Sequence, residues 1–231
     1  MCGRYTLTKQ DGVVEDLQAS LGLTAQHAWW KPRFNIAPTQ PAPVAIVRDG
    51  ERVIEMMRWG LVPHWAGKTG KRPPLMINAR VETLQSRPVF RDAFERKRCL
   101  VPADGFFEWR RENKVPLPQY IHPAPRRVVA FAGIWTRAGD VTSFAIITSR
   151  PHPLVAPIHD RMPIVLPHDA YDAWLDPDPA RARELLGVPG EAAMHGWLVE
   201  PVSSWVNKAD HDDPVCIEPV AAPAQRSLFE R

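Results

Sequence analysis

Short apolar runs rich in β-branched and aromatic residues dominate the sequence. The 25 prolines gather at the boundaries of these runs, where they are typical of rigid loops between strands. Strands are predicted at residues 43–47, 53–57, 99–101, 128–135, 141–148, 162–166 and 197–202. Because strand-like and helix-like segments do not alternate regularly, the pattern favours an α+β fold over a doubly wound one. We expect a curled, largely antiparallel, barrel-like β-sheet with peripheral helices.

Helical patterns are fewer. Thr8 can cap a helix that runs to about Leu21 with its apolar residues on one side, and Gly22 would end it. Shorter helices are predicted at residues 88–97, 169–175 and 180–186.

Length and composition indicate one domain. The 231 residues include 45% hydrophobic residues and 9 tryptophans, which is ample material for one buried core. We expect this domain to span residues 1–215, followed by a mobile Pro/Ala-rich tail over residues 216–231. A monomer is the simplest expectation.

Several classes of protein are excluded by the same sequence. The apolar runs are too short to span a bilayer, and no charged-then-apolar leader opens the chain, so we expect a cytoplasmic protein without a membrane partner. Cys2, Cys99 and Cys216 have neither disulfide nor zinc-site spacing. Reduced thiols are therefore expected, with no metal and no cofactor.

The charge is distributed unevenly along the chain. Residues 1–111 carry 18 Lys and Arg against 11 Asp and Glu, whereas residues 112–231 carry 11 against 15. This imbalance permits a basic, phosphate-facing surface although the net charge is only +3. A random scatter of solvated charges is the open alternative.

Cys2 follows the initiator methionine directly, and its small side chain would let a methionine aminopeptidase expose it. The new terminus would be a 1,2-aminothiol, whose amine titrates at about 7.7 to 8.0 and whose thiol titrates near about 8.5. An aldehyde reacts with both groups. The amine forms an imine, and the sulfur then closes a five-membered thiazolidine. By itself, however, Cys2 could be merely the second residue of an ordinary protein.

Six short motifs follow one another in a specific order. They are Met1–Tyr5, Phe34–Gln40, Trp59–Pro63, Asn78–Thr83, Arg98–Trp109 and Ile158–Pro163. Together they resemble the SOS-response-associated peptidase (SRAP) family, the abasic-site processing proteins. The resemblance implies a nucleoid-associated enzyme that binds single-stranded DNA and forms a covalent thiazolidine crosslink with abasic sites, shielding them from strand breakage. It also implies secondary AP-lyase (Schiff-base) chemistry, crosslink reversal and autoproteolysis limited to Met1.

The resemblance assigns a role to four residues within these motifs. Cys2 is the nucleophile, and Glu108 would hold the α-ammonium group and transfer protons during dehydration and ring closure. His159 would protonate the sugar ring oxygen, which opens the abasic sugar to its aldehyde. Asn78 would orient the terminus or a sugar hydroxyl, because its amide does not titrate. Taken singly, each supporting residue has a structural alternative: an ion pair, a packed loop or a cap.

Residues for binding DNA are expected in the same motifs. Three arginines, Arg4, Arg80 and Arg161, could form bidentate contacts with phosphates. Trp59, Trp65 and Trp109, with Asn35 and Pro38, could form platforms for neighbouring bases. With 9 tryptophans in the chain, core packing is the alternative for each of them.

The tail suggests a further partner. Its Gln225–Phe229 segment resembles the short peptide by which bacterial proteins dock on the replication sliding clamp, with Gln225, Leu228 and Phe229 as the matching residues and Arg226 as a departure. Two alternative functions stay open. One is an N-terminal-nucleophile glutamine amidotransferase, which also begins with an exposed cysteine followed by glycine. The other is a non-catalytic single-strand binder in which Cys2 is incidental.

Overall fold

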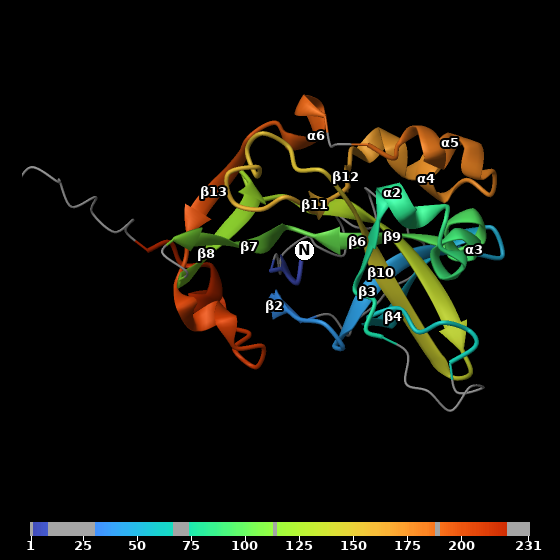
Figure 1. The fold of residues 1–231 in the computed structure, drawn as a ribbon, viewed down its shortest axis with the longest axis horizontal. Coiled ribbons are helices and arrows are strands. Elements are labelled where there is room, and N and C mark those ends of the chain that lie inside the picture. The colour runs from blue at the N-terminus through green and yellow to red at the C-terminus, as the bar shows by residue number, and fades with distance from the viewer. Residues whose placement is uncertain (1, 9–30, 67–73, 113–114, 188–189, 221–231) are drawn as a thin grey trace, which may run out of the picture.

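Two β-sheets form the centre of the protein in a computed structural model that describes residues 2–8, 31–66, 74–112, 115–187 and 190–220 (Figure 1). The first sheet has five strands in the order β13-β8-β7-β1-β2. Its strands are β1 (Arg4–Leu7), β2 (Arg33–Ile36), β7 (Gly105–Glu112), β8 (Val115–Pro123) and β13 (Trp197–Pro201). All neighbouring strands in it are antiparallel.

The second sheet has eight strands and closes on itself. Its strands are β3 (Pro41–Arg48), β4 (Glu51–Trp59), β5 (Asn78–Arg80), β6 (Arg98–Ala103), β9 (Val129–Ala138), β10 (Val141–Ser149), β11 (Met162–Pro163) and β12 (Val165–Leu166). The strand order β10-β4-β3-β6-β9 returns to β10 through a direct β9–β10 pairing, which makes a five-stranded barrel. The predicted α+β fold with a barrel-like sheet is thereby confirmed. Within the barrel β10 and β4 are parallel.

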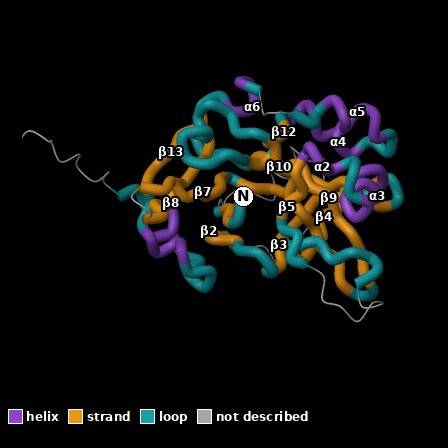
Figure 2. The backbone as a smooth tube through the Cα atoms, viewed as in Figure 1, coloured by secondary structure: helices purple, strands orange, loops and turns teal. Residues whose placement is uncertain are grey.

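Helices gather on one side of the barrel, and a further helical segment lies beside the five-stranded sheet (Figure 2). The α-helices are α2 (Val81–Leu84), α3 (Pro88–Arg96), α4 (Tyr171–Leu175), α5 (Pro179–Glu184) and α6 (Glu191–Met194), and the 3-10 helices are η1 (His168–Ala170), η2 (Ser204–Asn207) and η3 (Pro214–Ile217). Pro88 and Pro179 stand at the first positions of their helices, where the fixed φ of proline suits the helical backbone. Buried Arg98 donates to the carbonyls of Glu95 and Trp174 and so ties α3 to α4.

The predicted elements match this structure closely. Each of the seven predicted strands overlaps an observed strand, and the helices predicted at 88–97, 169–175 and 180–186 correspond to α3, to η1 with α4, and to α5. The helix expected from Thr8 to Leu21 lies outside the described residues except for Thr8. The backbone N–H and the hydroxyl of Thr8 both donate to Asp104, each at 2.6 Å. The expected tail is described only as far as residue 220, and no described helix is long and apolar enough to cross a membrane.

Strand β1 is fixed within the five-stranded sheet by buried polar contacts. Asp104 accepts a hydrogen bond from the Thr6 hydroxyl at 2.5 Å, and this hydroxyl lies 2.9 Å from that of Tyr120. Gly105 is required beside them, because a Cβ there would lie 2.5 Å from the Tyr120 ring. Since these buried groups satisfy one another, β1 has one fixed position, and with it the residues that precede it.

Candidate active site

Cys2 lies just before β1, near the middle of the face shown in Figure 1. Its side chain is fully buried in an apolar cluster with Tyr5 and Trp59. The Asn78 amide donates to its carbonyl oxygen at 2.8 Å, and its thiol lies 3.8 Å from the carbonyl of Arg4. Cys2 is therefore held by its backbone, and its side chain is excluded from water.

The environment of Cys2 keeps the thiol protonated. Burial raises the pKa of the Cys2 thiol well above its ordinary value, and the carboxylate of Glu108 raises it further. A reaction at this sulfur must therefore remove the S–H proton as the new bond forms.

Glu108 is a candidate to take that proton, because its charge acts on the Cys2 thiol. It extends from β7 with a side chain only 2% exposed. Burial raises the pKa of the Glu108 carboxyl to about 8, and the negative charge of Asp160 also acts to raise it. A carboxyl with this pKa is largely protonated at pH 7 and can both give and accept a proton near neutrality.

His159 faces Glu108 from the loop before β11. Its Nε2 lies 3.9 Å from Oε2 of Glu108, and its Nδ1 accepts the backbone N–H of Arg161 at 3.0 Å. Burial lowers the pKa of His159, although the neighbouring Asp160 carboxylate opposes this effect. The hydrogen bond from Arg161 favours the neutral tautomer with its proton on Nε2, on the side of Glu108, while Oδ1 of Asp160 lies 3.1 Å from Nδ1 and would pair with the charged imidazolium.

Asn78 connects the terminus to the barrel. Its strand β5 runs parallel to β10, with Asn78 beside Ile146. The amide nitrogen holds the Cys2 carbonyl, while the buried Oδ1 has no hydrogen-bond partner among the described residues. Within the part of the chain that the structure describes, that oxygen is an unpaired acceptor inside the site. The structure thus brings all four residues predicted for catalysis, Cys2, Asn78, Glu108 and His159, to one place.

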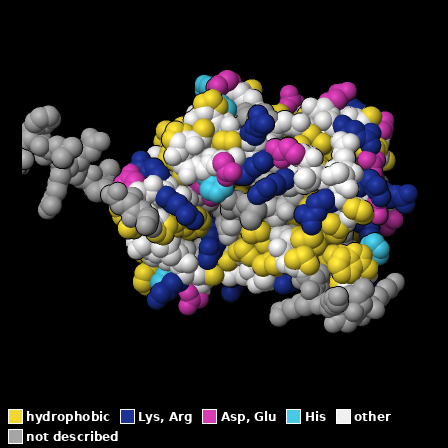
Figure 3. Space-filling view, in the orientation of Figure 1, with side chains coloured by type: hydrophobic (Ala, Val, Ile, Leu, Met, Phe, Trp, Pro, Cys, Tyr) yellow, Lys and Arg dark blue, Asp and Glu magenta, His cyan; other side chains and the backbone are white. Residues whose placement is uncertain are grey.

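Arginine side chains lie around these four residues. Arg161 binds both carboxylate oxygens of Glu82 through Nη1, at 2.6 and 2.8 Å, and Arg80 is exposed at the end of β5. Arg4 lies half-buried at the start of β1 and donates to the carbonyl of Asn207 at 3.4 Å. Lys and Arg side chains gather around the middle of this face (Figure 3). The arrangement suits a polyanion that passes close to Cys2.

A family comparison agrees with the geometry. The family model described as SOS response associated peptidase (SRAP) matches residues 1–209. The chain belongs to the SRAP family. Its relatives include the abasic site processing protein YoqW of Bacillus subtilis, 36% identical over 94% of this chain and 99% of the relative. The abasic site processing protein YedK of Escherichia coli is 28% identical over 95% and 100% of the two chains, and HMCES of Gallus gallus is 31% identical over 83% and 67%.

Solved structures share the SRAP fold. A protein from Bacteroides thetaiotaomicron superposes with a TM-score of 0.78 at 23% identity, over 95% of this chain and 100% of the other. A phage-related protein from Bordetella bronchiseptica gives a TM-score of 0.69 at 28% identity, over 87% and 94% of the two chains. The barrel with its five-stranded companion sheet is therefore the architecture of a larger group.

Two predicted DNA contacts of this SRAP chain are corrected by burial. Trp59 is 0% exposed, with its indole N–H bonded to the Ile77 carbonyl, so it belongs to the core. Asn35 is also fully buried, and its amide nitrogen lies within 3.1 Å of the carbonyls of Val206, Lys208 and His211. Neither side chain offers a surface to a base. Their predicted role as platforms is wrong, because both side chains are fully buried.

The other predicted platforms remain accessible. Trp65 is 37% exposed, and Pro38 is half-buried. Trp109 is half-buried too, and its indole N–H donates to Oδ1 of Asn207 at 2.7 Å. These three residues remain proposed contacts.

Sequence reasoning missed three residues of this SRAP site. Glu82 holds Arg161, and Asn207 contacts both Arg4 and Trp109. Thr148 on β10 is buried, and its hydroxyl has no hydrogen-bond partner among the described residues. Glu82 could have been found from the sequence, because it lies within the Asn78–Thr83 motif. Thr148 and Asn207 lie outside the motifs and can be recognised only in the folded structure.

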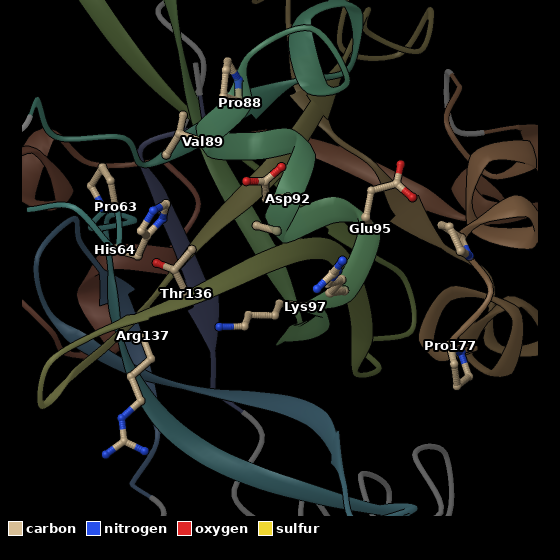
Figure 4. Close-up of a pocket in the computed structure, with 13 residues that line it drawn as sticks. Pro63, His64, Pro88, Val89, Asp92, Glu95, Lys97, Thr136, Arg137 and Pro177 are labelled. Atoms are coloured by element: carbon tan, nitrogen blue, oxygen red, sulfur yellow. The ribbon is translucent and has the colours of Figure 1, made fainter.

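A cleft of about 700 Å³ opens away from this site, over α3 (Figure 4). It is lined by side chains of both charges, among them Asp92, Lys97 and Arg137, and none of the four predicted catalytic residues lines it. Within the described part of the chain no group of three His, Cys, Asp or Glu residues has the geometry of a metal site.

Proposed function

We propose that the chain binds single-stranded DNA and forms a thiazolidine crosslink with abasic sites through Cys2, after Met1 has been removed. The observation that carries the proposal is the convergence of Asn78, Glu108 and His159 on the N-terminal Cys2. Relatives named abasic site processing proteins, YoqW and YedK among them, support the choice of substrate. The crosslink would shield the damaged strand from breakage, and the protein would act where such DNA occurs, at the nucleoid.

The proposed reaction uses Glu108 twice. The free amine of Cys2 adds to the sugar aldehyde and gives a carbinolamine. Protonated Glu108 donates its proton to the leaving hydroxyl, so that water departs and an iminium ion forms. The Cys2 sulfur then attacks the iminium carbon while Glu108, now a carboxylate, takes the thiol proton. The products are one thiazolidine and one water molecule, and Glu108 returns to its protonated form.

His159 and Asn78 would prepare the sugar. An abasic sugar is mostly a closed ring. The imidazolium form of His159 would protonate the ring oxygen through Nε2 and take up the proton that the C1 hydroxyl loses, so that the aldehyde is released and His159 returns to its starting form. The free Oδ1 of Asn78 would accept a hydrogen bond from a sugar hydroxyl, while its nitrogen holds the terminus. From the same imine, β-elimination of the 3′ phosphate would cleave the strand. AP-lyase activity and slow crosslink reversal are therefore proposed as secondary reactions, with autoproteolysis limited to Met1.

The DNA would follow the cations and exposed aromatic residues. Arg4, Arg80 and Arg161 would contact phosphates on either side of the missing base. Pro38 and Trp65 would support neighbouring bases, because their neighbours Thr39 and Ala66 line a cleft of about 530 Å³. Binding of this kind weakens steeply with salt and shows little sequence preference.

A covalent assay with three DNA strands tests the proposal. We expect the mature protein to give a band that survives heat and denaturant with a strand that carries an abasic aldehyde. An intact strand and a strand with a tetrahydrofuran analogue, which has no aldehyde, should give none. Equal, salt-reversible retention of all three strands would instead identify a non-catalytic binder. Intact mass of the adduct should place the attachment on Cys2.

We further propose that Gln225, Leu228 and Phe229, which lie outside the described residues, bind the replication sliding clamp. Tethering would raise the local concentration of the protein at replication forks. A pull-down with purified clamp is expected to recover the full chain at least about 10-fold better than a chain ending at residue 224. A Leu228→Ala, Phe229→Ala variant should behave like the truncated chain. Equal recovery of all three proteins would contradict clamp binding.

A further inference from the structure

An exposed aromatic stack lies beside the candidate active site. In the segment 203–213, which contains η2, the Trp205 ring stacks on the His211 ring, with 3.5 Å between centroids and 19° between planes. The Trp205 side chain is nevertheless 42% exposed. Figure 1 shows this segment, in orange, near the N-terminal end of the chain. Because His211 covers only one side of the indole, the exposed part of the Trp205 side chain can still receive a planar ligand.

Asn207 joins this segment to the site. It follows Trp205 by two residues, its side chain accepts the indole N–H of Trp109 at 2.7 Å, and its carbonyl lies 3.4 Å from Nη2 of Arg4. Arg4 and Trp109 are two of the residues proposed to contact DNA. A strand that passes from Cys2 over Arg4 therefore meets this segment next.

The stack is rigid before any ligand arrives. The Trp205 indole N–H donates to Asp213 at 3.0 Å, and Nδ1 of His211 lies 2.8 Å from the Trp205 carbonyl. The buried side-chain amide of Asn35 also donates hydrogen bonds to the backbone carbonyls of Lys208 and His211. A preorganised ring loses little conformational entropy when a ligand stacks on it. The free energy of binding is therefore not reduced by the cost of ordering the loop.

The charges of the segment also suit a nucleic acid. The carboxylate of Asp212 pairs with Arg33 and accepts hydrogen bonds from the backbone N–H groups of Phe34 and Asn35. The carboxylate of Asp213 accepts hydrogen bonds from the Trp205 indole and the backbone N–H of Val215. Their carboxylates are thus partly neutralised by groups within the protein. Lys208 is exposed between η2 and His211, where it can meet a phosphate.

We propose that the Trp205–His211 stack is a base-stacking platform for single-stranded DNA. It would hold a base on one side of the abasic nucleotide, beyond Arg4 and Trp109, while Lys208 meets the adjoining phosphate. This inference rests on the proposed function, because that function brings the strand to Cys2. It adds a second anchoring point, so that strands reaching the platform bind more tightly than strands that end before it.

The test is equilibrium binding of strands that carry the tetrahydrofuran analogue, which cannot crosslink. A short strand of about 4 nucleotides is compared with strands extended to about 16 nucleotides on the 5′ side or on the 3′ side. We expect Trp205→Ala to weaken the binding of one of the two extended strands about 10-fold and to leave the short strand unchanged. Trp205→Phe, which keeps a stacking ring, should restore most of the affinity.

Controls separate the platform from the fold and from the chemistry. Asp210→Ala, on the same segment and also exposed, should keep or slightly increase the affinity. Unchanged binding of both extended strands by Trp205→Ala, or equal weakening of short and extended strands, would overturn the platform. Because the probe has no aldehyde, this result does not depend on crosslinking. Length-dependent binding without any crosslink to the aldehyde strand would refute the proposed function and leave the platform standing.

Discussion

Replacing Cys2 by alanine is expected to remove the heat-stable crosslink while leaving an imine that borohydride can trap. The variant keeps a small second residue, so Met1 can still be removed and the α-amine remains free. That amine can condense with the aldehyde, but no sulfur is present to close the ring. Because an imine hydrolyses readily, the adduct on a denaturing gel should fall to background, a loss of at least about 100-fold.

Reduction with borohydride separates the two steps. The Cys2→Ala variant should give a stable band only when borohydride is present, and the wild-type chain should give one in either case. Cys99→Ala is the matched control, since Cys99 is a buried thiol of the same apolar cluster and should be dispensable for crosslinking. A heat-stable adduct of Cys2→Ala without borohydride would show that ring closure by sulfur is not the stabilising step.

The sequence predicted the barrel better than it predicted the companion sheet. Strands β3, β6, β9 and β10 contain continuous apolar runs, because both of their faces are buried over most of their length, whereas β4 carries Glu and Arg residues and is mostly half-buried. Strands β7 and β8 were not predicted. Their outer parts carry Arg, Glu and Pro, and their pairing depends on contacts such as Gly105 against Tyr120 that are distant in sequence.

For the site, the motifs located the residues and the structure decided their roles. Trp59 and Asn35 stand in motifs as prominent as those of Glu108 and Asn78, yet both are buried and structural. A motif records that a residue type is needed and does not distinguish packing from contact with a ligand. The raised pKa of Glu108 could not be predicted either, because it arises from burial between elements far apart in the chain.

Substituting Glu108 by glutamine should slow crosslinking and stabilise the fold at once. Loss of the proton donor and acceptor should reduce the rate at saturating DNA about 100-fold or more. The wild-type rate should fall above about pH 8, where Glu108 loses the proton that it donates, and the variant should lack this alkaline decline. Single-turnover gel assays between pH 6 and about pH 9 measure both effects. Trp59→Phe, a core change beside Cys2, is the control that should keep the alkaline decline.

Glu108→Gln is expected to lower the crosslinking rate but to raise the free energy of unfolding, and the gain in stability depends on pH. Below the ordinary glutamate pKa of about 4.3, Glu108 is protonated in both the folded and the unfolded chain, and the substitution should change little. As pH rises towards the folded-state pKa of about 8, the unfolded chain ionises freely while the folded chain must keep the proton or bury a charge. The wild type therefore loses stability across this interval, and Glu108→Gln does not. We expect the Tm of the variant to exceed that of the wild type by about 5 to 10 °C at pH 8 and to match it near pH 4.5. A Tm difference that stays constant with pH would mean that Glu108 titrates normally, and the acid step assigned to it would lose its physical basis.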